Sequence, residues 1–149
     1  MPLHPVLVHF PIACAAVAGL FQLLAVIFRR PSLTLPAVLT LGLGAVMGLA
    51  AAVTGTAQEE VVGQLPGIHD SLELHETLGN ITTWLMGLGS LVFIYLHLKG
   101  KLHPWVFLLA LIALATLVQV TGHYGGILVY QFGAGVNLPG EVNSINALP

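Results

Sequence analysis

Four long apolar segments, separated by short polar stretches, dominate the pattern of the chain. They cover approximately residues 6–28, 33–54, 74–97 and 104–123. Each supplies about the 20 consecutive apolar residues that a helix needs to cross a hydrocarbon core of about 30 Å. The pattern therefore predicts an all-α fold, in which four transmembrane helices form an up-and-down bundle.

The segments outside these spans are polar or rich in glycine and proline. Residues 55–72 form a polar connector, and the turn LKGKLH joins the third span to the fourth. Residues 124–149 form a Gly-rich tail, whose run ILVYQFGAGVNLP is too short to cross a membrane and is expected to lie against the helix ends as a lid. A cleaved signal peptide over residues 1–28 is the weaker alternative, because no Lys or Arg precedes its long apolar core. We therefore treat residues 1–149 as a single membrane domain.

Composition narrows the class of protein further. Hydrophobic residues make up 56% of the chain and charged residues only 7%, whereas an ordinary soluble domain has about 25% charged residues. The chain is thus an integral membrane protein with no room for a large soluble domain. Its net charge is −2 and its four basic residues are dispersed, so the sequence does not show the basic patch that is typical of nucleic-acid binding. No nucleophile elbow or phosphate loop is present, so no catalytic residue is assigned and an electron-transfer subunit is favoured over an independent enzyme.

The charges divide between the two ends of the predicted bundle. Every basic residue follows the first or the third span, and the positive-inside rule places that side in the cytoplasm. Both termini and the acidic residues then lie on the outer side. The basic residues are Arg29, Arg30, Lys99 and Lys101, and the acidic residues are Glu59, Glu60, Asp70, Glu73, Glu76 and Glu141.

Histidines gather at the predicted outer ends of the spans. His9 opens the first span, His75 opens the third and His123 closes the fourth. Bundle cores build cofactor and metal sites from side chains that converge in this way. The three imidazoles are therefore the candidate ligands of a cofactor or a metal ion.

Other polar residues receive secondary roles. His4, which precedes a proline, is a reserve ligand for the cofactor. Gln119, one turn before His123, is expected to hydrogen-bond the ring of that histidine, since a ligating imidazole usually donates its other N–H. The remaining histidines, in a loop or at the opposite interface, receive no ligand role: His69, His97 and His103.

Three hypotheses for this site stay open. A b-type haem needs one or two imidazoles in an apolar slot, although no Lys or Arg lies on the outer side to pair with its propionates. A zinc, copper or iron ion needs three or four His or carboxylate ligands; the acidic connector suits a cation, but no H-x-x-x-H spacing is present. A non-catalytic anchor or assembly subunit of a redox complex needs neither, and the short loops agree with it.

Several motifs together resemble the bacterial membrane family known as domain of unknown function 2231. They are the opening HPVLVHFPI, the Thr54-Gly55 pair, the segment HETLGN and the closing TGHYGGILVYQFGAGV. The similarity extends from about residue 3 to 136. One departure is that Gln131 and Phe132 stand where the family often has a basic residue, which removes a cation from the outer surface.

The resemblance implies a four-span protein that is often encoded or fused with redox modules such as cytochrome c or Rieske-type domains, with no established activity. The family's histidine motif corresponds here to His4, His9, His75 and His123. We therefore expect a multi-pass protein of the bacterial inner membrane that binds haem b for electron transfer near the outer face. Lipid surrounds it, and quinol or a periplasmic cytochrome or other redox protein would be its partner. A homo-oligomer and a subunit of a larger complex are both open.

Overall fold

The computed structural model describes residues 3–136 and is helical, with no strand in that range. This confirms the predicted all-α fold. The elements are α1 (His4–Leu7), α2 (His9–Ile27), the short 3-10 helix η1 (Pro31–Leu33), α3 (Thr34–Val62), α4 (His69–Leu98) and α5 (Pro104–Phe132). Helices α1 and α2 form one nearly continuous span interrupted at Val8. Pro11, which cannot donate a backbone hydrogen bond to Leu7, accounts for the interruption.

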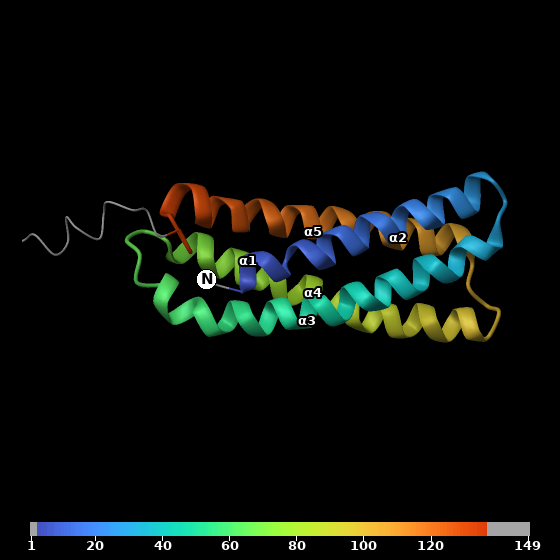
Figure 1. The fold of residues 1–149 in the computed structure, drawn as a ribbon, viewed down its shortest axis with the longest axis horizontal. Coiled ribbons are helices and arrows are strands. Elements are labelled where there is room, and N and C mark those ends of the chain that lie inside the picture. The colour runs from blue at the N-terminus through green and yellow to red at the C-terminus, as the bar shows by residue number, and fades with distance from the viewer. Residues whose placement is uncertain (1–2, 137–149) are drawn as a thin grey trace, which may run out of the picture.

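The four long helices form a bundle in which each packs against two neighbours. Helix α2 contacts α3 and α5, and α4 contacts the same two helices from the other side, while α1 packs on α3. Figure 1 shows the α2–α3 and α4–α5 connections at one end of the bundle and the α3–α4 connection at the other. The predicted up-and-down order is therefore present, and four helices in the described part are long and apolar enough to cross a membrane.

Three helices extend beyond their predicted spans at the acidic end, and α4 does so by beginning at His69 rather than near residue 74. Helix α3 continues to Val62 and α5 continues to Phe132, whereas the apolar pattern ends near residues 54 and 123. Hydropathy indicates only which part of a helix is stable in lipid. The helix itself continues beyond that part wherever its backbone groups remain hydrogen-bonded. Gly133, with a φ of 71°, ends α5 in the left-handed conformation. The predicted lid is the run 127–139, and its first part, residues 127–132, forms the end of α5. Residues 137–149 lie outside the described residues.

Small residues make up much of the interior of α2 and α3, and many large apolar side chains of the bundle point outward. Leu39, Val46 and Trp84 are 60%, 65% and 68% exposed, as expected for side chains that face lipid. Small residues let membrane helices approach closely. Much of the buried surface of α2 and α3 is of this kind: Ala15, Ala18, Ala25, Ala37, Gly44, Gly48 and Ala51.

The tightest approach is at Gly44 of α3. A Cβ at this position would lie 2.8 Å from the Cβ of Cys14 and 3.1 Å from the Cε of Met86. Only glycine therefore fits between α2 and α4 here. Nearer the other end, the buried Gln22 donates from Nε2 to the Pro104 carbonyl at 2.9 Å and connects α2 to the start of α5.

Charge separates the two ends of the bundle. The end with the α2–α3 and α4–α5 connections carries Arg29, Arg30, Lys99 and Lys101, and we call it the basic end. The end with the α3–α4 connection is called the acidic end. It carries Glu59, Glu60, Asp70, Glu73 and Glu76.

Candidate functional site

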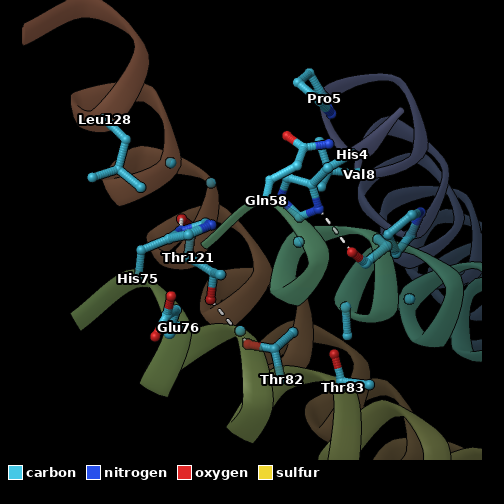
Figure 2. Close-up of a pocket in the computed structure, with 18 of the residues that line it drawn as sticks. His4, Pro5, Val8, Gln58, His75, Glu76, Thr82, Thr83, Thr121 and Leu128 are labelled. Atoms are coloured by element: carbon cyan, nitrogen blue, oxygen red, sulfur yellow. Dashed lines mark hydrogen bonds between the residues drawn. The ribbon is translucent and has the colours of Figure 1, made fainter. Parts of the chain in front are cut away.

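A cavity of about 510 Å³ lies in the half of the bundle nearer the acidic end. All four spans contribute to its wall, and most of the lining is apolar or small. Met86 and Val118 line its deepest part, farthest from the acidic end. Figure 2 shows His4 and His75 among the side chains that surround this space. A site of this size suits a small molecule or cofactor.

His4 enters the cavity from the first turn of the chain. Its Nδ1 donates a hydrogen bond of 2.7 Å to the carbonyl of Ala51 on α3. The ring lies against Gly55, one turn further along α3, where a Cβ would be 2.9 Å from Cε1 of the imidazole. The carbonyl and the glycine together fix the position of this ring.

His75 enters from the first third of α4 and is held in the same manner. Its Nδ1 donates to the carbonyl of Thr121 on α5 at 3.1 Å. The ring lies against Gly125, one turn further along α5, where a Cβ would be 3.0 Å from Cε1. The Thr121 hydroxyl is itself hydrogen-bonded to that of Thr82 at 2.9 Å, which ties α5 to α4 beneath the ring.

The two imidazoles lie next to each other across the cavity. Their ring centroids are 6.3 Å apart and their planes cross at 81°. A carbonyl oxygen can only accept a hydrogen bond, so Nδ1 carries the proton in both rings. In the neutral imidazole, Nε2 then has the lone pair, and it is the nitrogen available to bind a metal.

The wall of the cavity is unsymmetrical in polarity. Helices α3 and α4 contribute most of its polar side chains, including two carboxylates. The opposite side, formed by α2 and α5, is mainly apolar. The polar residues from α3 and α4 are Thr56, Gln58, Glu59, Glu76, Asn80, Thr82 and Thr83, and the apolar residues opposite include Ile12, Val118, Leu128 and Val129.

The structure does not bring the predicted ligand trio together. His9 borders the cavity but is exposed, and its Nδ1 bonds to the Pro5 carbonyl at 2.6 Å within its own helical turn. His123 is exposed and stacks edge-on against Tyr124, with ring centroids 5.6 Å apart, and it does not line the cavity. Gln119 is exposed as well. Of the residues singled out in the sequence, only His4 and His75 point into the cavity as a pair.

Helical phase explains the different positions of these side chains. Residues advance by about 100° around a helix, so side chains four positions apart share a face and those two apart do not. His123 follows Thr121 by two positions and faces away, whereas Gly125 follows it by four and lies beneath His75. The apolar pattern of the chain predicts no role for Gly55 or Gly125.

The described residues contain no group of three or more His, Cys, Asp or Glu side chains placed to hold a metal ion. A bare ion would therefore find two imidazoles and no third protein ligand of these types in residues 3–136. Glu59 and Glu76 also line the cavity, yet they do not converge with the two rings into such a group.

No curated protein and no solved structure matches the chain significantly. The model of one family, described as "Predicted membrane protein (DUF2231)", matches residues 1–138. That range includes every helix of the bundle and the three histidines that line the cavity, His4, His9 and His75. The chain therefore belongs to the family of membrane proteins known as domain of unknown function 2231.

Proposed function

We propose that the protein binds one b-type haem between His4 and His75 and transfers electrons within the membrane. The observation that carries the proposal is the pair of anchored imidazoles, 6.3 Å apart between ring centroids. Two imidazoles on opposite sides of one metal, with bonds of about 2 Å, have centroids about 6.4 Å apart. The observed separation matches that arrangement.

The number of protein ligands also favours haem over a bare metal ion. A porphyrin supplies four equatorial nitrogens, so the protein has to supply only the axial ligands of the iron. His4 and His75 are two such ligands, while a zinc or copper site would need more. Nδ1–H donation to the carbonyls of Ala51 and Thr121 holds each ring and raises the basicity of Nε2.

The cavity offers an apolar surface for a porphyrin and polar groups at one side for its propionates. No Lys or Arg among residues 3–136 lines it, so neutral donors would have to hydrogen-bond the propionates. The amides of Gln58 and Asn80 and the hydroxyl of Thr83 are available for this. The nearby carboxylates of Glu59 and Glu76 stabilise the ferric state over the ferrous state and favour a low reduction potential.

Haem iron supplies one-electron chemistry when it is bound. The protein holds the axial imidazoles, excludes water with the apolar side of the cavity and sets the depth of the site. The cavity lies toward the acidic end, which the positive-inside rule places on the outer side of a bacterial inner membrane. Membrane quinol is the proposed donor, and a periplasmic cytochrome or other redox protein is the proposed acceptor.

Haem binding is tested with the full chain, purified from cells supplied with a haem precursor. The expected spectrum is that of a six-coordinate, low-spin b-type haem with one haem per chain. His4→Ala and His75→Ala should each convert it to a high-spin spectrum or abolish binding, because each removes one axial ligand.

His123→Ala and His103→Ala are matched controls, since both side chains are exposed and lie outside the cavity. They should leave the spectrum unchanged. A colourless protein that takes up no haem would refute the proposal. A spectrum that depends on His123 but not on His4 would move the site to the surface of α5.

A further inference from the structure

The two connections at the basic end begin with the same backbone turn, although only the α2–α3 connection continues into a 3-10 helix, η1. Arg29 and Gly100 are both left-handed, with φ of 52° and 64°. The next amide in each turn donates back to the residue five positions earlier: Arg30 to the Ala25 carbonyl and Lys101 to the Leu96 carbonyl, both at 2.9 Å. Arg29 and Arg30 therefore correspond to Gly100 and Lys101, 71 positions later (100 − 29, 101 − 30).

The helices on either side of these turns correspond as well. Helices α3 and α5 each contain 29 residues, and α5 begins and ends 70 positions after α3 (104 − 34, 132 − 62). Three successive inward positions of α3 and their counterparts in α5 are buried. These pairs are Ala37 and Phe107, Val38 and Leu108, and Leu41 and Leu111.

The same offsets relate the two halves of the cavity. His75 follows His4 by 71 positions, and Thr121 and Gly125 follow Ala51 and Gly55 by 70 (121 − 51, 125 − 55). Each half therefore contains the same unit: an imidazole, the carbonyl that accepts its Nδ1–H, and a glycine one turn later that makes room for the ring. We call this the His–carbonyl–Gly unit.

We infer that the chain contains two copies of one helical hairpin, α1–α3 and α4–α5, and that Gly55 and Gly125 are equivalent positioning residues for the two imidazoles. The ligand then binds on the axis that relates the hairpins, with one unit on each side. The statement about ligand binding rests on the proposed function, whereas the equivalence of the two units stands on the geometry of the protein alone.

Both glycines act by leaving space. A methyl group at Gly55 would lie 2.9 Å from Cε1 and 3.0 Å from Nδ1 of His4, and a methyl group at Gly125 would lie 3.0 Å and 3.4 Å from the same atoms of His75. At these distances the ring has to move, and we expect the movement to disturb its hydrogen bond to the carbonyl. Gly79, which also lines the cavity, has no atom within 4 Å of a Cβ and is the matched control.

The first test uses the full chain without haem and with ¹⁵N-labelled histidine. NMR should find His4 and His75 fixed as the Nδ1-protonated tautomer, each resonance being assigned with its His→Ala variant. Gly55→Ala should abolish this signature for His4 but not for His75, and Gly125→Ala should do the reverse. Gly79→Ala should change neither. Loss of both signatures in one variant, or of neither, would overturn the inference.

The second test uses the haem-loaded protein. Gly55→Ala and Gly125→Ala should each give the same partial conversion from low-spin to high-spin haem, because each displaces one of two equivalent ligands. Added imidazole should restore the low-spin spectrum of haem that stays bound to the variant during purification. Unequal effects of the two variants would overturn the equivalence of the units. Absence of haem from every variant and from the parent would refute the proposed function and leave the NMR result to decide this inference.

Discussion

The imidazoles of His4 and His75 are each held by a carbonyl oxygen and by a glycine surface. Such contacts restrict the ring before any ligand arrives, so less conformational entropy is lost on binding. Carbonyl partners of ligating histidines typically contribute about 10–100-fold to metal affinity. The rings of His9 and His123 have no such contact with another span. We therefore assign the ligand role to His4 and His75.

The crossing angle of the two rings predicts a spectroscopic property. The planes of the two imidazoles cross at 81°, so the two ligands would interact with different d orbitals of the iron. These two orbitals would then stay close in energy. We expect EPR of the ferric protein to show a strongly anisotropic low-spin signal with one dominant low-field feature. A rhombic signal with three resolved features would indicate parallel imidazoles and contradict the observed ring geometry.

The sequence identified all the histidines of the site but not their pairing. The sequence predicts His9, His75 and His123 as ligands and His4 only as a reserve, although all four fall near the same end of the spans. Their roles depend on helical phase and on the interruption at Val8, which periodicity over an apolar segment does not reveal. The sequence signal that relates His4 to His75 is an internal repeat at a spacing of about 70 residues.

At the scale of the element, the four spans could be predicted well because membrane insertion depends on the same hydropathy that the pattern displays. The ends of α3 and α5 could not. Val62 and Phe132 end helical extensions that contain Glu59, Glu60 or glycine. The carboxylates are unfavourable in lipid and the glycines are weak helix formers. Neither prevents the helix from continuing, so helix length and span length differ at the acidic end.

Packing between elements predicts the effect of a single methyl group. Gly44→Ala would place its Cβ 2.8 Å from the Cβ of Cys14, so α2 and α3 must separate. Overpacking of this kind costs about 1–3 kcal/mol in the free energy of unfolding. Thermal or denaturant unfolding in detergent would measure the loss.

Gly19→Ala is the matched control for that substitution. No atom lies within 4 Å of a Cβ at this position of α2, and alanine is favoured over glycine in a helix by up to about 1 kcal/mol. We expect unchanged or slightly increased stability. Equal destabilisation by both substitutions would show that the Gly44 contact does not control the packing of α2 on α3.

For the whole molecule, the distribution of charge predicts orientation. We expect the basic end to face the cytoplasm, because its four Lys and Arg residues resist translocation. Glu60→Cys and Ser32→Cys, both at exposed positions near opposite ends, report on this in intact cells. A membrane-impermeant thiol reagent should label Glu60→Cys from outside and Ser32→Cys only after permeabilisation. The native Cys14 is buried and serves as the unlabelled background; the opposite labelling pattern would invert the topology.

The uneven polarity of the cavity has a consequence for its evolution. Two separate copies of a hairpin would have to present identical side chains on both sides of their axis. In a single chain the halves can diverge: Gln58 and Glu59 on α3 correspond to Leu128 and Val129 on α5, and all four line the cavity. Joining the hairpins thus allowed a symmetrical pair of imidazoles to be combined with an unsymmetrical wall. Such a wall can select one orientation of a ligand that has a polar and an apolar edge.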